Sequence, residues 1–343
     1  MAIGKGTRAV KWAVCEALRK RAGEWTAPAE LAAETLDAPA EVERAVEELR
    51  ADGYVIGRRR GGKIRFAGCG DRLIAHEITR DLKTRIIGGR VTVLERVAST
   101  NDAAWQEALS GAPEGTVIFA EEQTAGRGRM GRRWFSPPRS GLLFSVVLRP
   151  ELEVRQSHLL TVASAVAVAE ALQERLGVPA RIRWPNDITV RDRKVAGLLV
   201  EGRSLATGSA FVLGIGVNVR VRAREFPPEI RETATSLAAE TGTPPERNDL
   251  ACALLASLDR WYGDLRLGEY GHIARRWRRI SSTLGERVML LESGREFRGR
   301  VLDLSLEDGL IVRLDEGVTR IFHPSTVTLR QMPERRRGLT RRR

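Results

Sequence analysis

Residues 126–134 read Gly-Arg-Gly-Arg-Met-Gly-Arg-Arg-Trp, a run in which three glycines are interleaved with four arginines before a tryptophan closes it. Glycine exposes backbone N–H groups and lets the chain approach a ligand closely. Arginine adds a permanent charge and forked donors that suit carboxylates and phosphates. Because the run has few apolar side chains, we expect a loop that stays mobile until an anion neutralises it. The run therefore indicates chemistry on a negatively charged substrate. Taken alone, it is equally typical of an RNA-binding or solvated basic loop.

The chain around this loop alternates between strand-like and helix-like patterns. Ser99-Thr-Asn-Asp102 is a run of capping residues that predicts the start of a helix. Strands are predicted at 91–97, 116–121, 142–148, 180–184, 195–201 and 210–219, and long helices at 157–176 and 247–267. This order predicts a mixed α/β domain over residues 69–280, with one face of its sheet left for a ligand.

Both ends of the chain predict smaller domains. Residues 1–68 show three helical patterns and then two short strands, 54–56 and 63–66, around a basic turn. That order is typical of a winged helix-turn-helix domain. The alternative is a helical protein-interaction module with an incidental hairpin. Residues 281–330 contain only strand-like runs and predict a small β-barrel, and the arginine-rich stretch 331–343 predicts a disordered tail.

Composition narrows the class of protein. With 343 residues, 42% of them hydrophobic, the chain is long and apolar enough to fold into two or three globular domains. Its net charge of +13 favours anionic partners. The three cysteines lie far apart, without the spacing of a disulfide framework or a metal site. No signal peptide or membrane-spanning apolar run is present, so we expect a soluble cytoplasmic protein with no metal-ligating residues and no membrane association.

The positive charge of the first domain makes DNA a candidate partner. The residues predicted to contact DNA are Arg44 of the third helix and Arg58, Arg59, Arg60 and Lys63 around the basic turn. The same helix carries four glutamates, which phosphates repel, so most of these must face away from DNA. The alternative is that the arginine run is a solvated turn.

Lysine usage singles out one position. The chain uses arginine for nearly all of its positive charge, and Lys194 is the only lysine after residue 83. Where arginine would serve equally well, a retained lysine indicates a chemical reason, such as the need for a compact ammonium group. The alternatives are a surface lysine at the start of a strand, or chance.

Four segments decide between the possible anion sites. No P-loop is present, and the loop lies between strands rather than opening a helix, which disfavours a dinucleotide site. Ser99–Asp102, Gln123–Pro137, Arg183-Trp-Pro-Asn-Asp187 and Arg193–Glu201 together resemble the biotin protein ligases. With the N- and C-terminal domains added, residues 7–330 resemble the bifunctional ligase–repressors of the BirA family. The resemblance implies an α+β chain with a winged helix-turn-helix, a central biotin-ligase domain and an SH3-like barrel.

The resemblance also implies an activity. Such an enzyme is an ATP-dependent, AMP-forming biotin–[acetyl-CoA-carboxylase] ligase. It joins biotin to ATP as biotinyl-5′-AMP with Mg²⁺, then passes biotin to a lysine of the biotin carboxyl carrier protein. The adenylate-bound enzyme is expected to form a homodimer that binds operator DNA and represses transcription of biotin genes. The alternatives are a ligase whose winged helix does not bind DNA, a biotin-sensing regulator without turnover, and a lipoate ligase.

Site residues follow from the resemblance. The catalytic residues are Lys194, Arg127, Arg129 and Asp187. The residues implied to bind biotin are Ser99, Thr100, Asn101, Gln123, Arg127, Gly128, Arg129, Lys194 and Gly197, and those implied to bind the nucleotide are Arg129, Arg132, Trp134, Asn186 and Asn218. Asp187 either accepts the proton of the incoming lysine or holds Lys194 or Arg127 in place.

Two positions and one helix depart from the family pattern. Arg183 stands where many relatives have lysine, and Met130 replaces a commonly basic residue of the loop. Neither change removes a residue that the resemblance assigns to a ligand. The acidic third helix of the first domain is the larger departure, because it weakens the expectation of DNA binding and leaves the ligase untouched.

Overall fold

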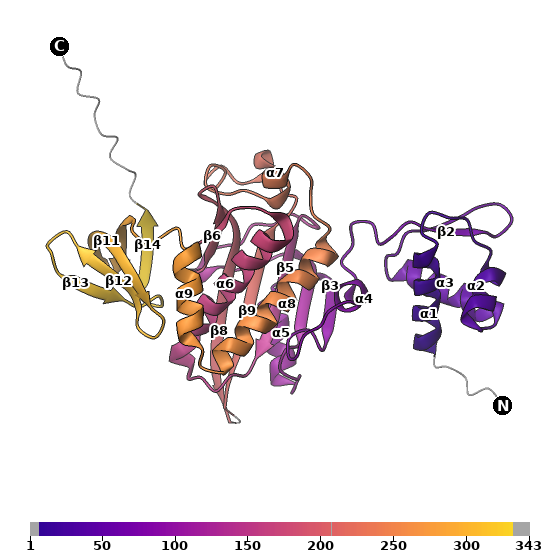
Figure 1. Cartoon of the computed structure of the whole chain (residues 1–343), viewed down its shortest axis with the longest axis horizontal. Helices are drawn as coiled ribbons and strands as arrows, with labels where there is room; N and C mark the ends of the chain where they lie inside the picture. The colour runs from indigo at the N-terminus through magenta and orange to yellow at the C-terminus, as the bar shows by residue number, and fades with distance from the viewer. Residues whose placement is uncertain (1–6, 207, 332–343) are drawn as a thin grey trace, which may run out of the picture. The chain divides into compact units, whose positions relative to one another are not determined.

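The computed structural model describes residues 7–206 and 208–331. The chain divides into two compact units, Met1–Ile78 and Thr79–Arg343, whose elements are labelled in Figure 1. The first unit extends past residue 68, the boundary predicted from the sequence, because Ile74 packs into its core. The second unit contains both the central sheet and the C-terminal strands.

Three helices and a short hairpin make up most of the first unit. They are α1 (Thr7–Lys20), α2 (Pro28–Thr35) and α3 (Pro39–Ala51), then the antiparallel pair β1 (Ile56–Arg58) and β2 (Ile64–Phe66), and α4 (Ala75–Thr79). Proline in the first turn suits the start of α2 and of α3, since the missing N–H would have no helical partner there. Apolar side chains at helical spacing, including Val14, Leu18, Val42 and Leu49, form one buried core.

A seven-stranded mixed sheet forms the centre of the second unit, which confirms the predicted mixed α/β domain. Its order is β3-β4-β5-β9-β8-β7-β6, with only β3 and β4 parallel. The strands are β3 (Val91–Val97), β4 (Val117–Gln123), β5 (Gly141–Leu148), β6 (Ala180–Arg183), β7 (Asp187–Val190), β8 (Arg193–Leu205) and β9 (Gly208–Asn218). β7 was not predicted, because its four residues follow β6 after a turn of only three.

Helices pack on this sheet. α6 (Ser157–Leu176), α8 (Arg247–Arg266) and α9 (Tyr270–Ile280) pack together, and Figure 1 shows them in front of the strands. α5 (Thr100–Leu109) packs against β4, β5 and β9. α9 was also not predicted, although its buried residues Ile273, Trp277 and Ile280 have helical spacing. Within the described ranges, no helix combines the length and apolarity that crossing a membrane requires.

The face of the sheet that carries α5 also carries the polar residues of the site. Val147 of β5 and Val212 of β9 pack with Trp105 of α5. Residues two apart on a strand point to the same face. Ser145 and Gly214 therefore face the same side as Val147 and Val212, next to the start of α5. The strand period thus brings a polar site to the N-terminal end of α5.

A second sheet follows α9. Its five antiparallel strands are β10 (Arg287–Glu292), β11 (Arg295–Ser305), β12 (Gly309–Leu314), β13 (Thr319–Phe322) and β14 (Val327–Gln331), in the order β13-β12-β11-β10-β14. Their alternate residues Val288, Leu290, Val301 and Val312 are buried. β14 was not predicted. The closed SH3-like form stays a prediction, and the predicted tail lies outside the described residues from 332 onward.

Two histidines join this second sheet to α6. His158, at the start of α6, donates from Nε2 to the carbonyl oxygen of Glu307 at 2.8 Å. His323, just after β13, lies 3.2 Å from His158 Nδ1 through its own Nε2. These bonds fit a neutral pair in which His323 donates and His158 Nδ1 accepts. Burial, together with the neighbouring His158, lowers the pKa of His323 below its ordinary 6.5.

Because of this histidine pair, we expect the free energy of unfolding to fall as the pH drops below 6.5, the ordinary pKa of histidine. A group whose pKa is lower in the folded than in the unfolded chain binds fewer protons when folded, so its contribution is complete above pH 6.5 and is lost below it. His323→Gln is expected to flatten the pH dependence of the free energy of unfolding between about pH 5 and pH 8. Urea titrations of both proteins across that range measure it. Parallel curves would contradict the prediction.

Candidate active site

One cavity of about 410 Å³ lies in the second unit. Among the residues that line it are all those that the sequence assigned to catalysis, biotin or nucleotide: Ser99, Thr100, Asn101, Gln123, Arg127, Gly128, Arg129, Arg132, Trp134, Asn186, Asp187, Lys194, Gly197 and Asn218. They come from α5, β4, β7, β8 and β9, and from the connections between these elements. The fold therefore brings the four sequence motifs together around a single space, although their individual roles stay predictions.

The inner end of the cavity is a buried polar cluster. Ser99, Thr100 and Asn101 are 3 to 4% exposed at the start of α5. Gln123 Oε1 accepts hydrogen bonds from the backbone N–H of Thr100 at 2.7 Å and from its hydroxyl at 3.0 Å. Ser145 Oγ lies 2.7 Å from Thr100 Oγ1 and donates to Asn101 Oδ1 at 2.6 Å. This cluster is a rigid set of donors and acceptors that suits a small polar head group.

Asn101 is held from three sides. Its Nδ2 donates to Glu201 Oε2 at 2.7 Å, and its Oδ1 accepts from Ser145. A Cβ atom on Gly214 would overlap the same Oδ1. The sequence reading missed Ser145 altogether and gave Glu201 no role. Glu201 ends the quoted motif 193–201, but nothing local to it indicates Asn101 as its partner. Glycine at 214 is therefore required by the close approach of the Asn101 side chain.

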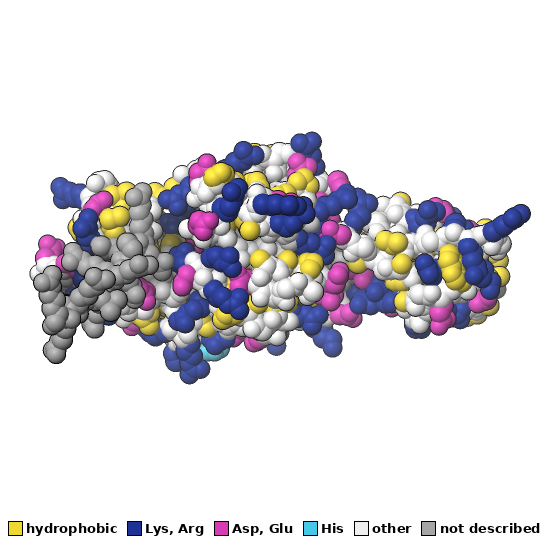
Figure 2. All heavy atoms as spheres, turned by 90° about the horizontal axis from the view of Figure 1, so that it is seen from above, with side chains coloured by type: hydrophobic (Ala, Val, Ile, Leu, Met, Phe, Trp, Pro, Cys, Tyr) yellow, Lys and Arg dark blue, Asp and Glu magenta, His cyan; other side chains and the backbone are white. Residues whose placement is uncertain are grey.

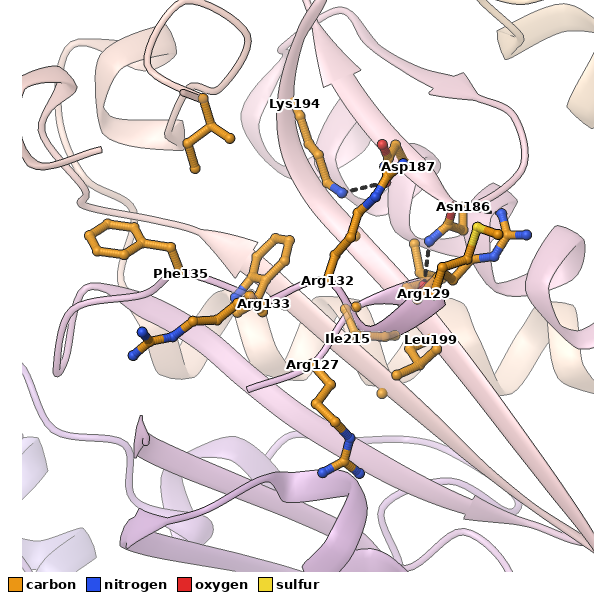
Figure 3. Close-up of a pocket in the computed structure, with 18 of the residues that line it drawn as sticks. Arg127, Arg129, Arg132, Arg133, Phe135, Asn186, Asp187, Lys194, Leu199 and Ile215 are labelled. Carbon is orange, nitrogen blue, oxygen red and sulfur yellow. Dashed lines mark hydrogen bonds and ion pairs between the residues drawn. The ribbon is translucent and has the colours of Figure 1, made fainter. Parts of the chain in front are cut away.

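Lys194 and Asp187 form an ion pair at the cavity wall. Lys194 Nζ lies 2.5 Å from Asp187 Oδ1, and Figure 3 shows the two side chains pointing toward one another. Both are partly exposed, at 33% and 28% of their side-chain surface. They sit on the neighbouring strands β7 and β8, where a register irregularity follows Ile188. The ammonium group is thus oriented by a carboxylate while its remaining donors face the cavity.

Arg127 has a different partner. Its guanidinium binds both carboxylate oxygens of Asp102, at 2.8 and 2.6 Å, and Figure 3 shows it directed away from the Lys194–Asp187 pair. The hypothesis that Asp187 holds Arg127 is therefore wrong, since Asp102 on α5 does so. The Arg127 hydrogen bonds lower the pKa of the Asp102 carboxyl. Asp102 was part of the quoted motif, but the sequence reading assigned it no site role.

Arg129 links the loop to the rest of the site. It donates to Asn186 Oδ1 at 3.4 Å and to the backbone carbonyl of Pro324, beyond β13. Burial lowers its pKa, which the nearby Asp187 opposes and Arg132 reinforces. Arginine still carries its charge at neutral pH, so a partly desolvated cation lies at the cavity.

The loop is closed on itself by backbone hydrogen bonds. Gly128 N–H donates to the Arg132 carbonyl at 2.7 Å, and Trp134 N–H donates to the Gly126 carbonyl at 2.9 Å. Met130, at the tip, has a left-handed φ of 56° and is 67% exposed. Thr328 Oγ1 donates to its sulfur at 3.0 Å. The expected ordering of the loop by an anion stays a prediction.

Trp134 lies on two glycines of the cavity wall. A Cβ atom would lie 2.9 Å from its ring at Gly197 and 2.5 Å at Gly216, so neither position leaves room for a side chain. Lys194 Nζ lies 5.3 Å from the ring centroid, within the range of a cation–π interaction. The indole Nε1 of Trp134 has no hydrogen-bond partner among the described residues. The indole therefore forms one wall of the site, and its contact with the nucleotide stays a prediction.

Each of the two asparagines implied to bind the nucleotide donates a hydrogen bond to the protein backbone. Asn186 Nδ2 donates to the Leu198 carbonyl at 2.7 Å, and Asn218 Nδ2 donates to the Thr235 carbonyl at 3.0 Å. Asn218 Oδ1 is buried, and the described part of the chain offers it no donor. Asn218 thus has an acceptor oriented within the lining of the cavity, and its contact with the nucleotide stays a prediction.

Two further segments were missed by the sequence reading. Phe226, Ile230, Thr233 and Ala234, in the connection after β9, line the cavity, as do residues 327–329 of β14. Phe226 packs with Val221 and Ala234, next to Phe135. The apolar Phe226, followed by two prolines in a connection, was a signal that this segment folds back onto the protein.

The residues predicted to bind DNA lie in the first unit. Arg58 Nη2 contacts Glu43 at 2.6 Å and Glu47 at 2.8 Å, so two of the four glutamates of α3 face the hairpin. The guanidinium of Arg59 lies 5.0 Å from the Trp25 ring centroid. Arg44 is 3.9 Å from Glu48 on α3. Arg60 and Lys63 lie in and beside the turn of the hairpin. Much of the charge of Arg58 is therefore compensated within the unit.

Charged side chains of both signs lie on the face of the protein shown in Figure 2. Figure 2 shows Lys and Arg side chains at many separate points of the face in view, with Asp and Glu between them. The full chain carries a net charge of +13. Such a charge favours the approach of anions to the protein.

Arg127→Ala is expected to lower turnover while changing the free energy of unfolding only slightly. Exposed ion pairs such as Arg127–Asp102 contribute at most about 1 kcal/mol to folding. A hydrogen bond from a charged group to a bound anion contributes about 1.5–3 kcal/mol, so turnover at this site should fall by at least about tenfold. The measurements are urea unfolding and steady-state kinetics. Arg155→Ala, which breaks the exposed pair with Glu153 outside the cavity, is the matched control. Equal kinetic losses in both variants would refute the assignment.

Comparison with known proteins places this site in context. Residues 93–218 match the biotin/lipoate A/B protein ligase family. The chain is 31% identical over 278 residues to the bifunctional ligase/repressor BirA of Bacillus subtilis, covering 81% of this chain and 86% of that one. It is 33% identical to the biotin–[acetyl-CoA-carboxylase] ligase of Mycobacterium tuberculosis, over 68% and 89% of the two chains. The biotin protein ligase of Aquifex aeolicus, solved with biotin and ATP, superposes with a TM-score of 0.63 at 30% identity, covering 71% of this chain and all of that one.

Proposed function

The chain belongs to the biotin protein ligases of the biotin/lipoate A/B protein ligase family, and from that premise we propose that it joins biotin to ATP and passes it to a carrier-protein lysine. It is an enzyme of the biotin–[acetyl-CoA-carboxylase] ligase class. The observation that carries the proposal is the single cavity in which the Gly/Arg loop, the Lys194–Asp187 pair and the buried cluster at Ser99–Asn101 meet.

The first step would form biotinyl-5′-AMP. A biotin carboxylate oxygen attacks the α-phosphorus of ATP, an acyl–phosphate bond forms, and pyrophosphate leaves. Both reacting groups are anionic, so fixed positive charge must offset their repulsion. Lys194 and Arg129 supply that charge, with Arg127 at the loop. The ureido head of biotin has donors and acceptors that suit the buried cluster of Thr100, Asn101 and their partners.

Mg²⁺ fits this site only as an ion that arrives with ATP. Magnesium usually keeps several waters and binds one or two carboxylates together with substrate phosphates. Asp187 is the cavity's carboxylate and Asn186 its nearby amide oxygen. Among the described residues, the one set of three close metal-ligating side chains is Cys15, His76 and Glu77 in the first unit. In the cavity, magnesium that arrived with ATP would neutralise phosphate charge, and Asp187 and Asn186 would be its protein ligands.

The second step would transfer biotin to the carrier. The neutral amine of the carrier lysine attacks the acyl carbon, an amide forms, and AMP leaves with the bonding electrons of the C–O bond. The amine must lose a proton in this step. The 2.5 Å contact with Lys194 supports the role of Asp187 as the group that orients the ammonium. Its partial exposure, 28%, is compatible with the alternative role as proton acceptor.

Isotope exchange tests the proposal. With biotin, ATP and Mg²⁺, the enzyme should exchange labelled pyrophosphate into ATP, and should then label the lysine of a purified biotin carboxyl carrier domain. Substituting lipoate for biotin separates the lipoate-ligase alternative. Biotin binding without exchange would instead identify a regulator without turnover.

A repressor function is the second candidate. We propose that the first unit binds operator DNA when the enzyme carries biotinyl-5′-AMP and forms a homodimer. It is supported by the order of three helices and a hairpin, by the basic turn at Arg59, Arg60 and Lys63, and by the 81% coverage of the match to a ligase/repressor. The pairing of Arg58 with Glu43 and Glu47 speaks against a phosphate contact by that one residue.

DNA binding is tested by gel-shift titration against the promoter of the organism's biotin-synthesis genes, with and without biotin and ATP. The double variant Arg60→Ala, Lys63→Ala should weaken binding and lower its salt dependence by about two ion equivalents. Sedimentation under the same conditions measures dimer formation. Binding that ignores salt, adenylate and both substitutions would leave a ligase whose first unit has another role.

A further inference from the structure

Glu240 joins the turn that precedes Lys194 to the segment that is hydrogen-bonded to the Lys194 backbone, and we propose that it is a positioning residue for adenylate formation. It lies on α7 (Leu237–Thr241), a short helix after the connection that covers the cavity. This inference rests on the proposed ligase function. Glu240 does not line the cavity itself, so it would act through the residues that it binds.

The carboxylate of Glu240 is completely buried and fully bonded. Its side chain is 0% exposed. Oε2 accepts from Arg191 Nη1 at 2.5 Å, while Oε1 accepts from Arg193 Nη2 at 2.7 Å and from Thr235 Oγ1 at 2.7 Å. A buried carboxylate is tolerated only when such charged and neutral donors satisfy it. Three donors from two separate segments therefore meet on one side chain.

The first of these segments is the tight turn that precedes Lys194. Arg191 and Asp192 have left-handed φ values of 47° and 61°, which close the connection between β7 and β8 in two residues. Neither residue is a glycine, so the turn carries strain that neighbouring contacts must hold. The bonds from Arg191 and Arg193 to Glu240 fasten this turn on both sides of its tip.

The second segment is bonded directly to the backbone of Lys194. Lys194 N–H donates to the Thr233 carbonyl at 2.7 Å, and Thr235 N–H donates to the Lys194 carbonyl at 2.9 Å. Asn218 Nδ2 also binds the Thr235 carbonyl. Thr233 and Ala234 line the cavity. Glu240 therefore joins the turn before Lys194 to the strip of chain paired with it, and so fixes where the ammonium group points.

A purely structural role is the rival explanation, and the chain offers a matched control. Glu170 on α6 is another largely buried carboxylate, with 10% of its side chain exposed, and it accepts from Arg260, from Arg276 and from Trp261 Nε1 at 2.7 Å. It does not line the cavity. Glu240→Gln and Glu170→Gln each remove one charge from a cluster with two arginines, so their general effects on folding should be similar.

The experiment compares these variants in the full-length protein. Glu240→Gln is expected to lower kcat for biotin-dependent ATP–pyrophosphate exchange by about tenfold, since small displacements of a catalytic group are costly. The KM for biotin should stay unchanged, because the cluster at Thr100 and Asn101 is untouched. Glu170→Gln should keep the kcat of the wild type at matched stability. Equal kcat in the two variants would overturn the inference.

Two further measurements test the positioning role, and the second of them does not depend on turnover. Thr235→Val should reproduce part of the loss in kcat, and Thr235→Ser, which keeps the hydroxyl, should restore it. Lys194 is the only lysine after residue 83, so its reductive methylation can be followed by mass spectrometry of one peptide. We expect its labelling rate to rise several-fold in Glu240→Gln and not in Glu170→Gln. Identical labelling would refute the positioning role, whereas absence of exchange in the wild type would refute the ligase function itself.

Discussion

Replacing Lys194 with Ala is expected to lower the rate of biotin adenylation by about 100- to 1,000-fold, the usual loss when one preorganised donor to a developing anion is removed. The ammonium group faces the cavity, is oriented by Asp187 at 2.5 Å, and lies over Trp134. In the proposed reaction, its loss removes a charge at the point where the two anionic reactants meet. Pyrophosphate exchange with saturating biotin and ATP measures the effect as a fall in kcat.

Two companion variants sharpen this prediction. Lys194→Arg keeps the charge but replaces a compact ammonium with a planar fork, so it should recover only part of the activity. Lys83→Ala removes an exposed lysine outside the cavity and should leave kcat unchanged. If Lys194→Ala retains the exchange rate of the wild type, the assignment of this lysine is wrong and the charge must come from the arginines of the loop.

Gly214→Ala is expected to raise the KM for biotin by about 100-fold. The added methyl group would overlap Asn101 Oδ1, and Asn101 has no room to yield because Ser145 and Glu201 bind its two amide atoms. Overpacking such a site costs up to about 3 kcal/mol. The damage is local to the buried cluster, so the nucleotide side should be affected much less. Steady-state kinetics with each substrate varied in turn measure the difference.

The control for this substitution is Gly263→Ala. Gly263 lies within α8, has no positive φ, and a Cβ atom there would meet nothing within 4 Å. Alanine should be accepted there with a small gain in helix stability. A Gly214→Ala enzyme with unaltered KM for biotin would show that the substrate head group does not occupy the space beside Asn101.

Local sequence patterns predicted the elements that have a strong period of their own. The bounds of β3 were predicted to the residue and those of α6 approximately, since each is a continuous strand-like or helical run with clear ends. The elements that were missed are short or weakly apolar. β7 has four residues and β14 five, and α9 buries only four of eleven among its arginines. Their stability comes from neighbours, because β14 exists by pairing with β10.

The residues of the site also fall into two groups, those that the sequence indicated and those that only the structure reveals. Residue type and usage were enough to single out Lys194 and the Gly/Arg loop, whereas Asp187 was implied by the resemblance to a family, and the comparisons confirm that family. The partners were not accessible, because each lies far away in the chain. Asp102 is 25 residues from Arg127, and Glu240 is 47 from Arg193. Which carboxylate meets which cation depends on strand order and connections, not on local sequence.

The arginine-rich loop was predicted to bind an anion, and nothing in residues 126–134 could have indicated where its side chains end. In the folded chain Arg127 is bound by Asp102 and Arg129 by Asn186 and Pro324, so the loop connects α5 on one side with the C-terminal sheet on the other. The sequence by itself determined the chemistry of the site, since charge and donor type are properties of single residues. Only the tertiary structure decided the geometry, because the seven-stranded sheet brings distant segments to one cavity and so selects the partner of each charge.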